Sequence, residues 1–328
     1  FGGEPLIEME LLCFIADQML ARTPPGIVLN MKLSTNGTLL TDGRLKALTA
    51  RKIYVSLSVD GPPEIHDRQR KNAVGKGTSQ AVIAAAKRLL KQNPCANVTC
   101  VLQPDTAAYA DECIDFLFGL GFRYFNLTMN YSANWTLDDM DTIEKSYRRL
   151  ADWYEAKTLA GATFYLSSFD ERIKSHTLVP ATGEEKCSLG KRQFSIAPDG
   201  AIYPCLQFVT TEGLPEFMIG HVLKGGLQDD CRQHISSCAT TPKEECSGCK
   251  VKSRCGSWCA CINYASTGTI TSASPVLCHF ERRILPVVDD LAAKLYRRRS
   301  RRFLHKHYNP DYPLLDYAEQ LAEASFRE

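Results

Sequence analysis

The residues best suited to chemistry in this sequence are its cysteines, which are unevenly placed. Ten of the fourteen lie between Cys187 and Cys278. Seven of these ten, here called the seven-cysteine frame, run Cys187-x12-Gly200-x4-Cys205, then Cys246-x2-Cys249-x5-Cys255-x3-Cys259, and end at Cys278. Thiolates are soft ligands that suit zinc or iron-sulfur clusters. The chain is too large to need disulfide bonds for its stability and shows no secretory signal, so the frame predicts metal binding rather than disulfides.

The number of thiolates separates two kinds of metal site. Read alone, the segment from Cys246 to Cys259 is equally compatible with a zinc knuckle. Seven thiolates are too many for one tetrahedral ion, so the complete frame favours two metal centres. The first half of the chain holds four more cysteines in apolar surroundings, which are expected to be inert packing residues: Cys13, Cys95, Cys100 and Cys113.

The elements that must position a site alternate along the first half of the chain. Helical periodicity is found in five segments, at residues 9–22, 42–50, 78–92, 109–120 and 137–159. Short β-rich runs lie between them, at residues 27–33, 53–59, 97–102 and 123–129. This alternation predicts an α/β fold with a parallel sheet whose carboxyl strand ends carry the site. From about residue 187 short strands and glycine turns predict a second, smaller domain, with no long amphipathic helix before residues 280–296.

The seven-cysteine frame resembles the SPASM domain of radical S-adenosylmethionine (SAM) peptide and protein maturases, whose spacing it matches at every interval. The resemblance implies two auxiliary 4Fe-4S clusters. Auxiliary cluster II would be held by Cys246, Cys249, Cys255 and Cys278. Auxiliary cluster I would be held by Cys187, Cys205 and Cys259. One iron of auxiliary cluster I would then lack a protein ligand, unless the ligand comes from Cys231, Cys238 or Cys261.

Three turns of the first half are similar to SAM-binding motifs of this family. Gly2-Gly3-Glu4-Pro5 exposes backbone carbonyls and a carboxylate acceptor for an ammonium group, and Ser34-Thr35-Asn36-Gly37 and Leu57-Ser58-Val59-Asp60-Gly61-Pro62 follow β-rich runs. The resemblance implies a SAM site formed by Gly2, Gly3, Glu4, Asn36, Ser58, Asp60 and Arg70. The alternative for each residue is a capping or turn role, or for Arg70 a surface ion pair.

The resemblance also implies a division of the chain. Residues 1–180 would form a partial (β/α)6 radical SAM barrel, residues 181–285 the SPASM domain, and residues 286–328 a C-terminal helix and tail, with the basic run from Arg297 to Arg302 closing that helix. The family's Cys-x3-Cys-x2-Cys loop, which binds the cluster that cleaves SAM, would precede Phe1. The sequence is therefore expected to be an N-terminally truncated fragment that is inactive alone.

Residues beside the frame distinguish two reactions of such maturases. Relatives that mature sulfatases add a cysteine between the first two of the frame and an aspartate, which serves as base, directly after the second. Here no cysteine lies between Cys187 and Cys205, and Leu206, which cannot accept a proton, follows Cys205. An open iron on auxiliary cluster I would bind a substrate thiolate. We therefore predict thioether cross-linking of a cysteine-rich ribosomal peptide, similar to the maturation of Cys-x-x-x repeat peptides, with formylglycine formation as the alternative.

The amino-acid composition limits the classes of binding partner that are expected. The 328 residues carry a formal net charge of +2, which gives no reason to expect nucleic acid or an anionic membrane. No run approaches the roughly 18 apolar residues of a membrane span. The expectation is a cytoplasmic enzyme whose partners are a peptide or protein substrate and an electron donor such as flavodoxin or ferredoxin. Two alternatives without redox chemistry remain: a structural zinc protein, and an inactive relative that only binds peptide leaders.

Overall fold

The computed structural model describes residues 2–177, 189–210, 212–256 and 258–309. This part of the chain divides into two compact units. The first unit contains the described residues up to Asn130, Lys145–Ile173 and those from Asp290 onward; the second unit contains Tyr131–Glu144 and the described residues of Lys174–Asp289. None of the helices in these ranges is both long and apolar enough to span a membrane.

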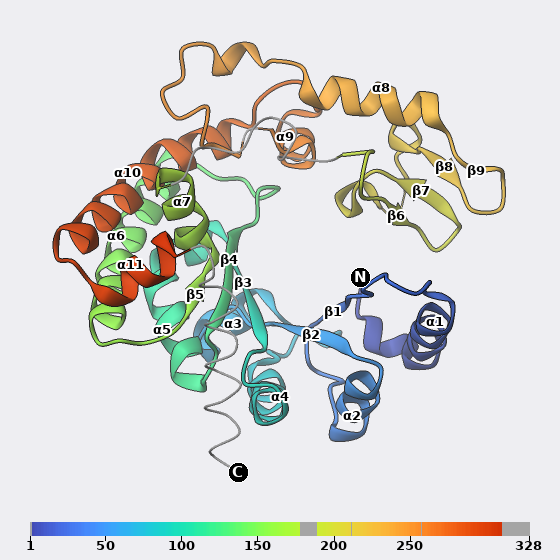
Figure 1. Cartoon of the computed structure of the whole chain (residues 1–328), viewed down its shortest axis with the longest axis horizontal. Helices are drawn as coiled ribbons and strands as arrows, with labels where there is room; N and C mark the ends of the chain where they lie inside the picture. The colour runs from blue at the N-terminus through green and yellow to red at the C-terminus, as the bar shows by residue number, and fades with distance from the viewer. Residues whose placement is uncertain (1, 178–188, 211, 257, 310–328) are drawn as a thin grey trace. The chain divides into compact units, whose positions relative to one another are not determined.

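A five-stranded parallel sheet forms the centre of the first unit (Figure 1). Its strands lie in chain order, namely β1 (Met31–Thr35), β2 (Ile53–Ser58), β3 (Asn97–Leu102), β4 (Tyr124–Met129) and β5 (Tyr165–Leu166). One register row crosses the whole sheet through Thr35, Leu57, Val98, Phe125 and Leu166. Since all five strands are parallel, their carboxyl ends lie at one edge, and the predicted α/β fold with a parallel sheet is confirmed.

Helices precede, separate and follow these strands in the sequence. They are α1 (Met9–Arg22), α2 (Asp42–Ala50), α3 (Pro63–Gln69), α4 (Ser79–Gln92), α5 (Ala110–Leu120), α6 (Leu137–Leu159) and α7 (Ser167–Thr177), with short 3-10 helices η1 (Pro5–Glu8) and η2 (Pro104–Tyr109). Helix α4 shows why they form, because its buried residues Val82, Ala85, Ala86 and Leu89 recur at helical spacing. Helix α5 ends where Gly121 takes a left-handed conformation.

Two expectations about the first unit are wrong. The sheet has five described strands where four were expected, because β5 is only two residues long and gives no periodic signal. The run at residues 27–33 is a strand only from Met31, where pairing with Ile53 begins. The apolar residues before it, Ile27 and Val28, are exposed.

The C-terminal helices complete the first unit around a buried carboxylate. Helix α10 (Pro275–Arg297) ends before Arg299, which has a φ of 51°, and the Ser300 hydroxyl caps α11 (Arg301–Tyr308) by accepting from the Phe303 amide at 3.4 Å. The basic run therefore includes a turn and the start of a second helix, not only a helix end. From α11, Lys306 Nζ lies 2.8 Å from the Asp170 carboxylate, which is 4% exposed.

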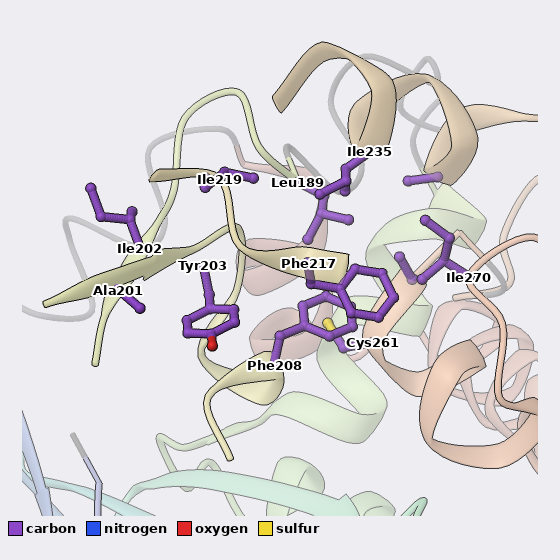
Figure 2. Close-up of a cluster of buried hydrophobic side chains, with 12 residues drawn as sticks. Leu189, Ala201, Ile202, Tyr203, Phe208, Phe217, Ile219, Ile235, Cys261 and Ile270 are labelled. Carbon is purple, nitrogen blue, oxygen red and sulfur yellow. The ribbon is translucent and has the colours of Figure 1, made fainter. Parts of the chain in front are cut away.

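The second unit contains a small antiparallel sheet and short helices. Its elements are β6 (Ser195–Ile196), β7 (Ala201–Tyr203), β8 (Gly220–His221), β9 (Gly226–Leu227), α8 (Asp229–Thr240), α9 (Ala260–Thr267), and the 3-10 helices η4 (Leu206–Phe208), η5 (Pro215–Phe217) and η6 (Glu244–Cys246). Figure 2 shows its core, where the Phe208 and Phe217 rings stack 4.2 Å apart and Cys261 lies among the buried residues.

The expectation of no long amphipathic helix before residues 280–296 overlooked the shorter helix α8. Helix α8 has 12 residues, of which only Ile235, Ser236 and Ala239 are buried. Because these buried residues are few and one of them is polar, the segment shows little apolar periodicity in the sequence. Helix α10 starts earlier than expected, at Pro275, where the Ser274 hydroxyl accepts from the Leu277 amide at 3.2 Å.

Candidate cofactor and metal-binding sites

The Glu4 carboxylate connects the opening glycine turn to the end of β1. It accepts hydrogen bonds from the Thr35 hydroxyl at 2.7 Å and from the Asn36 amide at 2.8 Å, and also from the Leu6 amide at 3.1 Å. Gly2 has a φ of 125°, a conformation that favours glycine, and both Gly2 and Gly3 are exposed. The structure thus brings Gly2, Gly3, Glu4 and Asn36 together at the edge of the sheet.

The turn after β1 is rigid because its side chains bond to its own backbone. The Asn36 side-chain oxygen accepts from the Thr38 amide at 2.9 Å and the Thr38 hydroxyl at 2.7 Å. Gly37 has a φ of 77°, and a β-carbon there would lie 2.6 Å from Leu57 Cδ1. The turn therefore requires glycine. Thr35 of β1 pairs with Leu57 of β2. Asn36 and Ser58, which come next in the sequence, therefore start from neighbouring positions at the ends of these strands.

Asp60 and Arg70, both predicted to contact a cofactor, bind each other. The Arg70 guanidinium donates to both Asp60 oxygens, with Nη2 at 3.1 Å from Oδ1, and the Val101 amide donates to Oδ1 at 2.9 Å. Asp60 is 7% exposed. Ser58, two residues earlier, is half-buried at the end of β2. The hydrogen bond from the Val101 amide fixes the loop after β2 to β3, and the ion pair fixes the same loop to the end of α3.

A buried histidine supports this loop. His66 Nδ1 accepts from the Asp60 amide at 3.2 Å, so its Nε2 carries the proton and donates to the Thr78 hydroxyl at 3.1 Å. That hydroxyl donates in turn to the Arg70 carbonyl at 2.9 Å. Burial lowers the pKa of His66, partly opposed by the charge of Asp60. A neutral imidazole is what this arrangement requires. No feature of the sequence indicated this role of Thr78, because Thr78 follows α3 and is 12 residues from His66 in the chain.

Three thiols of the second unit lie in contact. The Cys261 thiol donates to Cys205 Sγ at 3.3 Å and lies 3.9 Å from Cys259 Sγ. Cys205 precedes η4, Cys259 is the N-cap residue of α9, and Cys261 is in its first turn. The structure therefore joins two cysteines of the seven-cysteine frame, distant in sequence, with one that lies outside it.

The electrostatics of these thiols favour thiolates at the two frame positions. The hydrogen bond from Cys261 lowers the pKa of Cys205 to about 6, assisted by the Gln207 and Leu206 amides against burial. The Cys261 hydrogen bond also lowers the pKa of Cys259 to about 7, assisted by the Ile262 amide. The pKa of Cys261 is raised because its thiol proton is held between two acceptors. Lowered thiol pKa values are typical of reactive or ligating cysteines.

A second thiol group lies around Arg282. Arg282 Nη2 is 3.9 Å from Cys249 Sγ. The Val251 amide lowers the pKa of Cys249, and Arg282 contributes in the same sense. Burial raises the pKa of Cys278 in α10, and so do nearby Cys246 and Cys249. These electrostatic contacts place Cys246, Cys249 and Cys278 near one another. Cys255 is buried.

These thiols fit an iron-sulfur site by donor type, although they do not surround a ready-made centre. Iron-sulfur clusters are held by cysteine thiolates, and both groups offer them at partly buried positions. Within the described ranges, no set of three or more His, Cys, Asp or Glu side chains has an arrangement that could hold a metal ion. Cys187 lies outside the described residues. Of the four cysteines predicted to be inert, Cys95, Cys100 and Cys113 are buried and Cys13 is half-buried.

Comparisons with known proteins show that the chain is similar to one group of enzymes. No family model matches the chain. It is 26% identical to the cysteine-type anaerobic sulfatase-maturating enzyme of Clostridium perfringens over 79% of this chain and 72% of that protein. It is 24% identical to the serine-type enzyme of Klebsiella aerogenes over 79% of this chain and 65% of that protein.

Solved structures agree on the fold. The structure of native anSMEcpe with bound AdoMet and the Cp18Cys peptide superposes with a TM-score of 0.74 at 22% identity, covering 90% of this chain and 85% of that one. Streptococcus suis SuiB bound to S-adenosylmethionine superposes with a TM-score of 0.54 at 14% identity, covering 84% and 64%. The chain is therefore similar in sequence to the anaerobic sulfatase-maturating enzymes and shares the fold of the anSMEcpe structure.

Proposed function

We propose that this chain is a radical SAM maturase that modifies a cysteine or serine side chain of a peptide or protein. The observation that carries this proposal is the homology to cysteine- and serine-type anaerobic sulfatase-maturating enzymes over 79% of the chain, supported by the fold shared with a SAM- and peptide-bound relative. We assign residues 1–180 to the SAM-binding part, residues 181–285 to the auxiliary-cluster part, and residues 286–328 to a C-terminal segment.

We place SAM at the sheet edge where the polar turns meet. The exposed Gly2-Gly3 turn offers carbonyls, and Glu4 offers a carboxylate to the methionyl ammonium group. Asn36 and Ser58 extend the polar surface across β1 and β2, while the Asp60–Arg70 pair holds the next turn in place. When bound, SAM and its reducing cluster supply a radical that abstracts hydrogen from the substrate.

We propose that the two thiol groups of the second unit hold two auxiliary clusters. Auxiliary cluster II takes Cys246, Cys249, Cys255 and Cys278, and auxiliary cluster I takes Cys187, Cys205 and Cys259. The lowered pKa values of Cys205 and Cys259 support this assignment, because the thiolate is the metal ligand. When bound, such a cluster would supply an acceptor for the second electron of a two-electron oxidation.

For the reaction itself we propose thioether cross-linking at a peptide cysteine. Leu206 follows Cys205 and cannot act as the base that formylglycine formation would need. Formylglycine formation is the second candidate, favoured by the activity named for both relatives.

Mass spectrometry of a treated peptide decides between the two reactions. The full-length enzyme, SAM and a reductant are incubated with a cysteine-rich peptide encoded nearby. We expect each cross-link to remove two hydrogens and to protect one cysteine from alkylation. Fully alkylatable cysteines beside an oxidised serine or cysteine side chain would instead establish the sulfatase-type reaction, and an unchanged peptide would contradict both.

The proposed position of SAM predicts that the negative charge of Glu4 contributes to SAM affinity. Replacing Glu4 by glutamine removes the partner for an ammonium group, so we expect the affinity for SAM to fall about tenfold or more, since charge-assisted hydrogen bonds are worth about 1.5–3 kcal/mol and each 1.4 kcal/mol is a factor of ten. Equilibrium dialysis with labelled SAM measures this. Glu8→Gln, at an exposed carboxylate of η1, is the matched control. Equal affinities of the two variants would remove Glu4 from the site.

A further inference from the structure

The turn between α10 and α11 lines a cavity that carries an excess of positive charge. This cavity, here called the arginine cavity, has a volume of about 850 Å³ and lies within the first unit, where the end of α6 meets the turn (Figure 1). Three arginines line it, namely Arg299, Arg301 and Arg302. The chain has no Asp or Glu between residues 294 and 309. Ligand sites usually have volumes of about 300–1,000 Å³, so the arginine cavity is large enough for more than a single ion.

The nearby carboxylates already have other partners. Glu155 of α6 forms ion pairs with Lys294 and Arg298, and the buried Asp170 binds Lys306, as described above. In the part of the chain that the structure describes, the exposed side chains of Arg299 and Arg301 form no ion pair. Two positive charges of the arginine cavity are therefore available to a ligand.

The backbone around the arginine cavity also favours an anion. Ser300 and the first residues of α11 line it, and the N-terminus of a helix carries a partial positive charge. The end of α6 would oppose this effect if its carbonyls were free. However, the Lys157 and Thr158 carbonyls accept from the amides that follow the helix, at 3.0 and 3.1 Å.

The lining of the arginine cavity distinguishes an acidic peptide from a phosphate ion. Leu159, which is 46% exposed, and the half-buried Leu304 give the cavity an apolar wall. A phosphate ion would use only the charged groups, whereas a peptide also has aliphatic side chains that gain by burial against leucine. Arginine clusters recur in the recognition of acidic peptide motifs, because a guanidinium can bind a carboxylate through two N–H groups.

We propose that the arginine cavity binds an acidic segment of the peptide substrate. Arg299 and Arg301 donate to its carboxylates, and Leu159 packs against one of its aliphatic side chains. Helix α6 leads into the amino end of β5, so the cavity lies toward the edge of the sheet opposite the turns where we place SAM. The acidic segment is therefore distinct from the residue that is modified. This inference rests on the proposed function for the identity of the peptide, but binding itself needs neither SAM nor a cluster.

Fluorescence anisotropy tests this proposal without an activity assay. The whole chain, without SAM or reductant, is titrated into a short fluorescein-labelled peptide that alternates glutamate and leucine. We expect saturable binding to the wild type, and much weaker binding of the same peptide with glutamine in place of glutamate. This comparison uses only the wild type, so it does not depend on how a variant folds. Equal binding of the two peptides, or calorimetric binding of inorganic pyrophosphate without binding of the glutamate peptide, would overturn the proposal.

Two variants that lose the same charge locate the binding site. Arg301→Gln removes a cation from the arginine cavity, and we expect it to weaken binding of the glutamate peptide about tenfold. Arg297→Gln removes an exposed cation at the end of α10, outside the lining, and should weaken binding by at most about twofold. Equal losses in the two variants would show diffuse attraction by the basic run and would overturn the cavity as the site. The mass spectrometry described above tests the reaction separately, so either proposal can fail alone.

Discussion

Replacing Asp170 by asparagine is expected to destabilise the first unit by about 3–5 kcal/mol, the usual cost of breaking a buried ion pair from one side. The carboxylate accepts from the Tyr154 hydroxyl and the Leu166 amide, both at 2.6 Å, and faces Lys306 at 2.8 Å. Asparagine leaves the Lys306 charge buried, where its side chain is 10% exposed, without a counter-charge. Hydrogen exchange of peptides from β4 and β5 along a urea series measures this unit separately from the second.

The pH dependence of this ion pair follows from the sign of the shift. Burial raises the pKa of Asp170. The charge of Lys306 and the hydrogen bond from His307 together lower this pKa by more than burial raises it, so the pKa of Asp170 lies below its ordinary value. A carboxyl group whose folded pKa is depressed contributes stability above its unfolded pKa of about 3.9 and loses it as the pH falls through the folded value. The stabilisation by Asp170 is therefore constant at neutral pH and lost only in acid.

The control for this experiment is an exposed ion pair of the same unit. Asp17 receives two hydrogen bonds from Arg51, at 2.8 and 2.9 Å, and its side chain is 52% exposed. Asp17→Asn should change the unfolding free energy by no more than about 1 kcal/mol, because solvent screens such pairs. Equal destabilisation by the two variants would contradict the buried ion pair as the cause.

Replacing Cys249 by alanine is expected to remove one four-iron cluster and to loosen the second unit. Cys249 lies beside Arg282, with Cys246 and Cys278 in electrostatic range. The free energy of metal binding is also folding free energy, so losing a ligand destabilises the unit that binds the cluster. We expect iron to fall from about eight to about four per chain. Limited proteolysis should then cut the second unit earlier than in the wild type.

Cys13→Ala is the matched thiol deletion in the first unit. Cys13 lies half-buried in α1, outside the seven-cysteine frame. This variant should keep the full iron content and the wild-type pattern of proteolysis. The assignment of the frame fails if the two variants lose the same amount of iron, or if both keep all of it.

Regular elements could be predicted from the sequence where periodicity is strong. Helix α4 spans Ser79–Gln92, within one residue of the segment predicted at residues 78–92, and β3 spans Asn97–Leu102, where every second residue is buried. Helix α11 was not predicted as a separate helix, because the basic run from Arg297 to Arg302 was interpreted as the end of the preceding helix. The start of β1 was misplaced because Ile27 and Val28 are apolar yet exposed, and an apolar run does not reveal where pairing begins.

In the candidate sites too, some contacts could be predicted from the sequence and others could not. Glu4 and Asn36, which were predicted on two separate turns of one site, are joined by a hydrogen bond. The sequence left an ion pair open for Arg70 but did not identify Asp60 as its partner, because two residue types that can each bind a ligand can equally bind each other. The contact of Cys261 with Cys205 joins residues 56 positions apart, and nothing in the local spacing distinguishes Cys261 from the other cysteines outside the frame.

The bond between Lys306 and Asp170 spans 136 residues, and this has a consequence for synthesis on the ribosome. At about 5–20 residues per second, roughly 7–27 seconds separate the translation of the two residues. During that interval the sheet and α7 have emerged, but the lysine that neutralises the buried carboxylate does not yet exist. The nascent first unit must therefore wait, incompletely packed, until translation of the second unit has finished.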